Sequence, residues 1–384
     1  MMRALIAFDK FKDALSAAEA CAAVAGALPA EAKADVCPLT DGGEGFCSIL
    51  TRAAGGTLQT HRVTGPRGQA VDALFGLVAV EKIPATARAM LDLPDDGGRL
   101  AVIEMAQASG LALLSADRRD PWRTTSLGTG ELIQRVVEAG ARAVLLGVGG
   151  SATNDLGLGA LAALGWTFHD TAGAAVHPPA PAEWGRIVGI GGGPRVALPP
   201  IRIACDVTNP LLGARGATAV YGPQKGLVAE DFARLEGQCE AVSALLCRHF
   251  KRPLTLRKAP GAGAAGGIAF GLQCAAGAAM LPGFEFVAAW FDLEARLAAA
   301  DVVLTGEGRF DESSLEGKGP GAIVRRALAL GKPVHVFSGQ IAVPQPPVGL
   351  HLHAITSIGT PLSQALAETA TNLTTTVRQV FATL

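Results

Sequence analysis

The chain has 384 residues, of which 49% are hydrophobic and 17% charged, and its formal net charge is −1. A nearly neutral chain lacks the basic surface that nucleic acids and anionic membranes attract, so its composition argues against both classes of partner. The length predicts two domains, and 48 glycines with only 5% aromatic residues are typical of α/β enzymes with backbone-lined ligand loops.

The chain begins with a strand-like segment, a loop and a helix, and Ser16 and Glu19 have the spacing of a capping box. Further strand-like runs lie at 101–105, 143–146, 201–205, 302–305, 334–337 and 353–358. Helices are predicted at 130–139, 156–164, 229–250 and 321–330, and the final segment also has helical spacing. This alternation indicates mostly parallel sheets covered by helices.

Turn-rich segments at 63–68, 177–200 and 258–267 mark possible joints, but no long linker divides the chain. The simplest two-domain arrangement is an insertion, in which both chain ends build one domain and the middle builds the other. We predict that residues 1–62 and 290–384 form a Rossmann- or flavodoxin-like parallel sheet with helices. Residues 63–289 are predicted to form an inserted α/β domain.

Cysteine usage and the N-terminus bear on the compartment. Seven cysteines lie at positions 21, 37, 47, 205, 239, 247 and 274, without a CxxC pair or zinc spacing. Scattered thiols of this kind indicate a reducing compartment. The first apolar segment is too short for a signal peptide, and no run reaches the roughly 18 apolar residues that a membrane helix needs. We therefore expect a cytoplasmic protein.

Polar and acidic clusters with glycine recur after the strand-like runs. They are FDKFK at 8–12, LTDGGEG at 39–45, GGSATND at 149–155, ACDVTNP at 204–210 and TGEGRFDESSLEGKG at 305–319. Ligands of open α/β sheets bind beyond the carboxyl ends of the strands, so these loops predict one site. Phosphoryl transfer would use carboxylates for Mg²⁺, a cation for the moving phosphoryl group and glycine-rich backbone for a triphosphate.

The stretch GVGGSATNDLGLGALAALG, residues 147–165, joins a predicted buried strand to a predicted helix. Free backbone N–H groups at a helix start favour an anionic ligand, either a carboxylate or a phosphate. The polar side chains of this stretch are Ser151, Thr153, Asn154 and Asp155. For Asn154 or Asp155 taken alone, a helix cap is the alternative interpretation.

Several familiar motifs do not fit. GAGAAG at 261–266 matches the dinucleotide pattern G-x-G-x-x-G, but the charged segment LTLRKAP before it does not resemble a buried strand. A loop that binds the phosphates of a nucleotide is the alternative interpretation of this segment. The P-loop, the G-x-S-x-G elbow and the protein-kinase signatures are absent from the sequence. The histidines lie outside the acidic clusters, which disfavours a Ser/His hydrolase.

The motifs that point to a family follow one another from residue 3 to about residue 340. They are FDKFKDALSAAEA, DGGEG, VTGPRG, IEMAQASGL, TTSLGTGELI, GVGGSATNDLGLG, ACDVTNPLLGARGATAVYGPQKG, PGAGAAGG and TGEGRFDESSLEGKGP. With these motifs the sequence resembles the bacterial glycerate kinase family that is unrelated to P-loop kinases. The family's first loop usually reads PDSFKGSLSA. Here Phe8, Lys10, Asp13 and Ala14 depart from that pattern, and Lys10 adds a cation.

The resemblance implies phosphorylation of (R)-glycerate to 2-phosphoglycerate with ATP and Mg²⁺, in two α/β domains with the active site in the cleft between them. A 3-phosphoglycerate-forming glycerate kinase is the nearest alternative. More remote ones are an NAD-dependent hydroxy-acid dehydrogenase, based on the glycines of GAGAAG, and a sugar-acid sensor without turnover. We expect small-molecule partners, no nucleic acid and no membrane, and a homodimer as the candidate assembly.

Site roles are assigned as hypotheses. The catalytic candidates are Asp206, the carboxylate expected near the attacking hydroxyl, together with Asp155 and Lys12. The candidates for substrate binding are Asp9, Lys12, Asp41, Ser151, Thr153, Asn154, Asn209 and Lys225. The candidates for ATP binding are Gly261, Gly263, Gly266, Glu307, Arg309 and Asp311, and those for Mg²⁺ are Asp41, Asp206 and Glu307. Glu44 is a further acidic candidate for metal or ribose.

Overall fold

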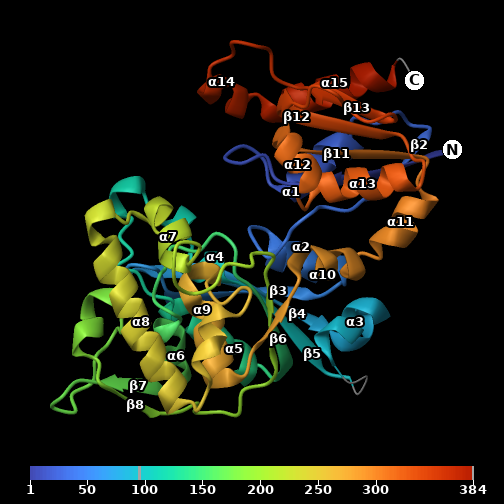
Figure 1. The fold of residues 1–384 in the computed structure, drawn as a ribbon. Coiled ribbons are helices and arrows are strands. Elements are labelled where there is room, and N and C mark those ends of the chain that lie inside the picture. Colours follow the sequence, from blue (N-terminus) through green and yellow to red (C-terminus); the bar gives the residue numbers. More distant parts are fainter. Residues whose placement is uncertain (94–96, 383–384) are drawn as a thin grey trace. The chain divides into compact units, whose positions relative to one another are not determined.

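The computed structural model describes residues 1–93 and 97–382. The chain divides into two compact units: unit 1 is Met1–Thr40 with Val287–Leu384, and unit 2 is Asp41–Phe286. Unit 2 is therefore inserted in the sequence between the two segments of unit 1 (Figure 1). The first boundary differs from the predicted one after residue 62, because residues 41–62 supply a helix and most of a strand to unit 2.

Unit 1 contains a five-stranded sheet of order β13-β12-β11-β1-β2, and all of its strand pairs are parallel. The strands are β1 (Met2–Phe8), β2 (Ala32–Val36), β11 (Val302–Asp311), β12 (Val334–Ala342) and β13 (Leu350–Ala354). Counted within the unit, the order is 2-1-3-4-5, that of flavodoxin-type sheets. In such sheets a ligand binds where the order reverses, beyond the carboxyl ends of β1 and β11.

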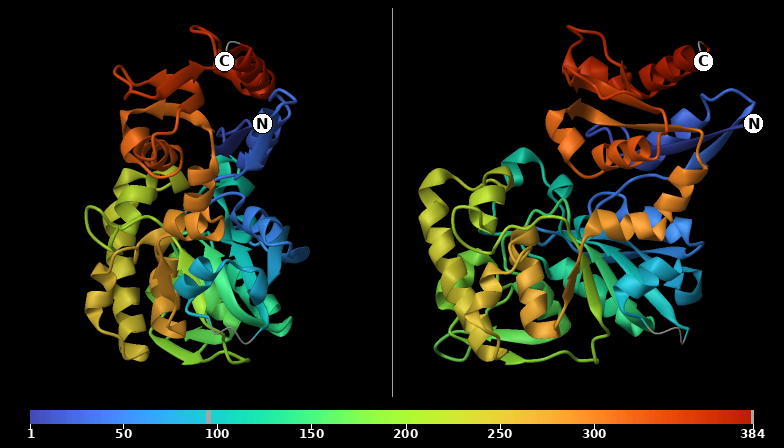
Figure 2. Two further views of the ribbon diagram at one scale, coloured as in Figure 1. Left: turned by 90° about the vertical axis from the view of Figure 1, so that its right-hand side faces the viewer. Right: turned by 45° about the vertical axis from the view of Figure 1, so that its right-hand side comes forward.

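Helices cover both faces of this sheet. They are α1 (Ala17–Ala25), α11 (Leu293–Ala299), α12 (Glu312–Glu316), α13 (Pro320–Ala329), α14 (Leu362–Ala367) and α15 (Thr369–Phe381). Helices α13 and α15 lie on opposite faces (Figure 2). Ile6 and Phe8 pack in one cluster with Val24 of α1 and Leu373 of α15. The predicted capping box at Ser16 is confirmed, since its side chain accepts from Glu19 N.

Unit 2 contains a six-stranded sheet of order β10-β9-β6-β5-β4-β3 and a separate hairpin of β7 and β8. The strands are β3 (Thr57–Thr64), β4 (Ala70–Ala79), β5 (Arg99–Glu104), β6 (Ala141–Gly147), β7 (Trp166–His169), β8 (Gly189–Gly192), β9 (Ile201–Ala204) and β10 (Ala279–Leu281). β5, β6, β9 and β10 are parallel, whereas β4 is antiparallel to both of its neighbours, β3 and β5. The register sets Glu104, Gly147 and Ala204 side by side at one edge.

The helices of unit 2 include short 3-10 turns. The α-helices are α2 (Phe46–Ala53), α3 (Ala85–Leu91), α4 (Met105–Ser109), α5 (Leu127–Glu138), α6 (Leu158–Leu164), α7 (Ala217–Tyr221), α8 (Phe232–His249) and α9 (Ala264–Ala276), and α10 (Gly283–Trp290) crosses the boundary to unit 1. The 3-10 turns are η1 (Val80–Lys82), η2 (Leu111–Leu113), η3 (Ala116–Arg118), η4 (Pro181–Arg186), η5 (Pro223–Lys225), η6 (Ala229–Asp231) and η7 (Leu254–Lys258).

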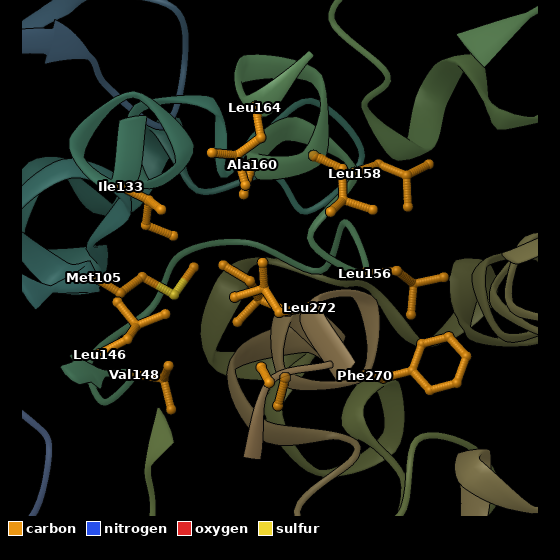
Figure 3. Packing of buried hydrophobic residues seen from close by; sticks show 14 of the residues in the cluster. Met105, Ile133, Leu146, Val148, Leu156, Leu158, Ala160, Leu164, Phe270 and Leu272 are labelled. Carbon is orange, nitrogen blue, oxygen red and sulfur yellow. The ribbon is translucent and has the colours of Figure 1, made fainter. Parts of the chain in front are cut away.

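The core of unit 2 lies between the sheet and helices α5, α6 and α9. Leu146 of β6, Leu158 of α6 and Phe270 of α9 are fully buried in one cluster (Figure 3). Burial of such side chains is the main favourable term in folding, at about 1.5–3 kcal/mol for each large aliphatic or aromatic residue. The sheet and these helices thus give the polar loops at the strand ends a rigid base.

The predicted α/β class with parallel sheets is confirmed, with local differences. The helix predicted from residue 156 begins at Leu158, because Leu156 and Gly157 have φ angles of 53° and 73°. β13 ends at Ala354, four residues before the predicted end of that strand at 358. The segment 63–68 leads into the turn between β3 and β4 rather than a domain joint.

The structure also bears on the compartment and membrane predictions. All seven cysteines are in the thiol form. Within residues 1–93 and 97–382, no helix combines the length and apolar character required to cross a bilayer.

Candidate active site

The acidic loop, residues 41–45, lies on the carboxyl ends of β6 and β9. Gly149 N–H donates to Gly42 O at 2.9 Å. A Cβ at Gly42 would lie 2.5 Å from Ala204 O, and one at Gly149 would lie 2.5 Å from Gly43 Cα. Side chains at these positions would therefore separate the loop from the strands. The glycines of DGGEG and GVGG allow the acidic loop to lie directly on the sheet edge.

Asp206 follows β9 at the same edge. Its Oδ2 accepts from Phe284 N–H at 2.7 Å. A Cβ at Gly283 would lie 2.1 Å from Asp41 O and 3.3 Å from Asp206 Oδ2, so both residues border this glycine. Asp206 is half-buried and Asp41 is exposed. Unit 2 thus brings together two of the three residues predicted to bind Mg²⁺.

Asp155 differs from Asp206, because it is fully buried and fully bonded. Oδ2 accepts from Ser126 N at 2.7 Å, Ser126 Oγ at 2.8 Å and Gly159 N at 3.2 Å, and Oδ1 accepts from Gly157 N at 3.1 Å. Burial raises the pKa of Asp155, while these hydrogen bonds act in the opposite direction. The geometry does not support the catalytic role assigned from sequence, since the carboxylate ties the loop before α5 to the start of α6.

Lys225 lies beneath the polar loop, residues 149–155. Its Nζ donates to Thr153 O at 2.6 Å and to Ser151 Oγ at 3.1 Å, and the side chain is 2% exposed. Burial lowers the pKa of Lys225 to about 7, and the nearby charge of Asp155 opposes this shift. Because Lys225 is enclosed, any influence on a ligand passes through Ser151, the more exposed hydroxyl, at 7%.

Thr153 and Asn154 are also fully buried. Asn154 Nδ2 donates to Thr218 Oγ1 at 3.4 Å. Neither Thr153 Oγ1 nor Asn154 Oδ1 has a hydrogen-bond partner among the described residues. Both residues were assigned to substrate binding from sequence, but neither side chain is exposed to a ligand.

The glycines of GAGAAG have packing partners within unit 2. A Cβ at Gly266 would lie 2.0 Å from Thr153 O, and one at Gly263 would lie 2.3 Å from Pro210 O. A Cβ at Gly261 would lie 2.7 Å from Met280 Cε. The segment before them is the 3-10 turn η7 rather than a strand. Close packing within unit 2 is therefore sufficient to explain why these positions are glycine. The contacts do not support the ATP-binding role assigned to them.

Asn209 orders the loop that follows β9. Its Nδ2 donates to Arg215 O at 2.8 Å, and its Oδ1 accepts from Tyr221 OH at 2.8 Å. Gly263 N–H donates to Asn209 O at 3.0 Å. Asn209 therefore connects three segments of unit 2, and this arrangement accounts for it as a structural residue.

Unit 1 carries a second acidic group, where the strand order reverses. Asp9 follows β1, and its N–H donates to Gly306 O at 3.0 Å on β11. Glu307 is the next residue of β11. Burial raises the pKa of Glu307 to about 7, and the negative charges of Asp9 and Asp311 add to this effect. This edge is where a flavodoxin-type sheet binds its ligand.

Asp311 and its neighbours continue this group. Asp311 is the N-cap of α12 and accepts from Ser314 N at 3.2 Å. Hydrogen bonding from the Ser313 hydroxyl is the main cause that lowers the pKa of Asp311. Arg309 Nε lies 3.1 Å from Asp311 Oδ2. Lys12, on the loop after β1, is exposed and reaches solvent.

The predicted Mg²⁺ residues come from both units, with Asp41 and Asp206 in unit 2 and Glu307 in unit 1. Across the described residues, no group of three or more His, Cys, Asp or Glu side chains is placed to hold a metal ion. The carboxylates of Asp41 and Asp206 are nevertheless the hard oxygen donors that Mg²⁺ prefers, so the chemistry of this pair fits the ion.

Two site-supporting residues were missed from sequence. Ser126 Oγ donates to Asp155 and accepts from Ala160 N at 2.9 Å. Glu104 ends β5 and is 1% exposed below the acidic loop. A carboxylate that ends an apolar run was the available signal for Glu104. For Ser126, the signal was the polar TTS segment before a predicted helix.

Together these features define an α/β protein with acidic, glycine-rich loops at the carboxyl ends of parallel strands in each unit. The model of the glycerate kinase family matches residues 4–384. The glycerate kinase of Bacillus subtilis (strain 168) is 36% identical, with 100% of this chain and 98% of the relative covered. The glycerate 2-kinase of Escherichia coli (strain K12) is 35% identical, with 100% and 98% covered.

A solved structure gives the same relationship. The crystal structure described as that of a glycerate kinase 2 from Salmonella typhimurium LT2 has a TM-score of 0.78 and 36% sequence identity. The match covers 100% of this chain and 98% of that one. The chain belongs to the glycerate kinase family.

Proposed function

We propose that the protein is an ATP-dependent glycerate kinase that converts (R)-glycerate to 2-phosphoglycerate. The observation that carries the proposal is the acidic loop beside Asp206, at the carboxyl ends of parallel strands, in a chain that the family model matches over residues 4–384. The full-length relative named glycerate 2-kinase supports the choice of product.

In this proposal Asp206 orients the attacking hydroxyl of glycerate and accepts its proton. The half-buried carboxylate is held by Phe284 N–H at 2.7 Å, which fixes its direction. Ser151 is proposed to bind the substrate's anionic group, with Lys225 donating to the same hydroxyl from below. Asp155, Thr153 and Asn154 are assigned to support of this loop rather than to direct contact.

Within unit 2, Asp41 and Asp206 would hold Mg²⁺. When bound, the ion neutralises phosphate charge as the phosphoryl group moves. Asp9 and Lys12 are proposed to contact the substrate, and Arg309 and Asp311 to contact ATP.

A coupled assay for ADP, run with and without glycerate and Mg²⁺, tests the activity. ADP formation that requires both supports the kinase. NADH formation from glycerate and NAD without ATP would indicate the dehydrogenase instead. Glycerate binding by calorimetry without turnover of ATP would indicate a sensor.

The product distinguishes the two kinase alternatives. Glycerate has a secondary hydroxyl beside the carboxylate and a primary one at the far end. If the carboxylate is held close to the transfer site, the secondary hydroxyl is the one presented in line, and positioning supplies most of the catalysis in phosphoryl transfer. Phosphorus NMR of the product, before any mutase is added, should show 2-phosphoglycerate. A main signal from 3-phosphoglycerate would contradict the proposed placement of the carboxylate.

A cytoplasmic location and a homodimeric assembly remain predictions. Cell fractionation tests the location, and light scattering of the purified protein tests the assembly.

A further inference from the structure

Glu104 is a buried carboxylate of unit 2 to which the proposed reaction gives no role. It ends β5 and is 1% exposed. Its Oε2 accepts from Cys47 N–H, in the first turn of α2, at 3.4 Å, and its Oε1 accepts from Gln107 Nε2 at 3.5 Å. The first backbone N–H groups of a helix have no partner within the helix, and a carboxylate that accepts from them stabilises the helix. Glu104 thus caps α2 from a neighbouring strand.

Helix α2 begins directly after the acidic loop, so the cap acts on that loop. The other end of the loop is fixed by the bond from Gly149 N–H to Gly42 O. Phe46, the first residue of α2, packs against β6, where a Cβ at Gly147 would lie 2.7 Å from its ring. Glu104 is therefore a charged side chain that anchors the helical end of the loop that carries Asp41.

We propose that Glu104 is a positioning residue, whose ionised carboxylate holds the acidic loop in the conformation that turnover requires. This inference rests on the proposed glycerate kinase activity. Glu104 acts through α2 and the loop, and it contacts neither substrate nor the transferred group. An ionised carboxylate binds N–H donors more strongly than a neutral carboxyl group does, so loss of its charge loosens the loop.

The groups that face Glu104 make it the titrating group of this cluster. Burial raises the pKa of Glu104 to about 7, and the charge of Glu44 in the loop adds to the shift. Burial raises the pKa of the Cys47 thiol to about 12, so Cys47 remains neutral. β6 contributes Gly147, and α4 contributes the uncharged Gln107.

The test compares the wild type with Glu104→Gln, which keeps the size of the side chain and removes its charge. The kcat and KM values for glycerate and ATP are measured by ADP release from pH 6 to pH 9. We expect wild-type kcat to rise through pH of about 7, and the variant to be about tenfold slower at pH 8 without this rise. Glu138→Gln, an exposed change on α5, is the matched control and should keep the wild-type profile.

A second readout separates this inference from the proposed function. Burial destabilises the ionised form of Glu104 by more than its hydrogen bonds stabilise it, so the contribution of Glu104 to stability is fully present below pH 4.5 and is lost as the pH rises through about 7. Thermal unfolding of Glu104→Gln should therefore lose this pH dependence, whether or not the protein is a glycerate kinase. If the wild type forms no ADP with glycerate, the proposed function fails, and only the unfolding comparison then bears on Glu104.

Three results would overturn the inference. One is a Glu104→Gln enzyme with wild-type kcat. Another is a slow variant whose kcat rises near pH 7 as in the wild type, because the rise would then come from another group, such as Glu307, whose pKa is also about 7. If Glu104→Gln does not fold, Glu104→Asp takes its place, because it keeps the charge on a shorter side chain. That variant should be slower and keep the rise, and loss of the rise there would be the third contrary result.

Discussion

Unit 1 and unit 2 both place acidic residues after buried strands, but the two sets lie in different environments. In unit 2, Asp155 is fully buried and accepts four hydrogen bonds from backbone and side chain. In unit 1, Glu307 lies beside Asp9 and Asp311, whose like charges help burial to raise its pKa to about 7. Burial raises the pKa of both carboxylates, but Asp155 is bonded to its own loops, whereas Glu307 faces like charges that favour binding of a cation or a proton.

The difference teaches that an acidic residue after a strand is not by itself a functional signal. A loop that passes under another segment, as residues 149–155 pass under Gly266, turns its polar side chains into internal supports. A loop that stays at the sheet edge leaves its carboxylate accessible, as with Asp206 after β9. Substitutions distinguish carboxylates that support a loop from carboxylates that act on a ligand.

The largest effect is expected for Asp206→Asn. The amide keeps the shape but loses the charge that orients the hydroxyl or a metal, so kcat should fall about a thousandfold, or roughly 4 kcal/mol in the barrier. Thermal unfolding should change little, because the residue is half-buried. ADP release and a melting curve measure both, with Glu138→Gln as the control. If turnover stays within about tenfold of the wild type, Asp206 is not the carboxylate that orients the attacking hydroxyl.

Asp155→Asn tests the opposite class. The substitution replaces an oxygen that accepts from Ser126 and Gly159 with an NH₂ group that cannot accept, so the free energy of unfolding should fall by about 3 kcal/mol. Urea denaturation measures this loss. A variant with wild-type stability but without activity would make Asp155 catalytic after all and would end the contrast between the two carboxylates.

A third prediction gives unit 1 an acid sensitivity of its own. His335 of β12 is 5% exposed, its Nδ1 lies 3.0 Å from His353 Nε2, and its ring stacks on that of His351. Burial lowers the pKa of His335 to about 4, and the two neighbouring histidines add to the shift. Because the folded pKa lies below the usual value of about 6.5, the stabilisation is present above pH 6.5 and is lost as the pH falls toward 4.

The expected loss from His335 between pH 6.5 and pH 4.5 is about 2 kcal/mol of unfolding free energy. Urea unfolding at both pH values, for the wild type and for His335→Phe, measures it. The Phe variant keeps an aromatic ring in the stack and cannot take up a proton, so its stability should depend less on pH. If the stability of the two proteins has the same pH dependence, protonation of His335 does not lower the free energy of unfolding.

The fold could be predicted where the sequence pattern is local. β1 and β6 contain continuous apolar runs at 4–8 and 143–146, and Ser16 with Glu19 marks the start of α1, so these elements follow from sequence. The hairpin of β3 and β4 was missed. Its first strand, TLQTHRVT, is largely polar because it is an edge strand with little burial.

The site could be predicted only in part, because exposure depends on contacts between distant residues. Asp155 is enclosed by Ser126, 29 positions earlier, and the loop before it is covered by Gly266. Glu104 binds the backbone of Cys47, 57 positions away. Sequence reasoning proposed which loops carry the site but could not tell which side chains in them reach the surface.

The smallest effect is expected for Lys12→Ala in unit 1. Lys12 is exposed on the loop after β1, so its loss should leave the free energy of unfolding unchanged, unlike a change at Asp155. As a phosphate or carboxylate contact it should raise KM for glycerate or ATP about tenfold, which corresponds to roughly 1.4 kcal/mol of binding free energy. Lys10→Ala is the matched control, because Lys10 lies two positions away and departs from the family pattern. Steady-state kinetics with each substrate varied in turn measure both. If the two alanine variants have the same KM values as the wild type, Lys12 is an ordinary surface lysine. The candidates for ligand contact in unit 1 are then its carboxylates and Arg309.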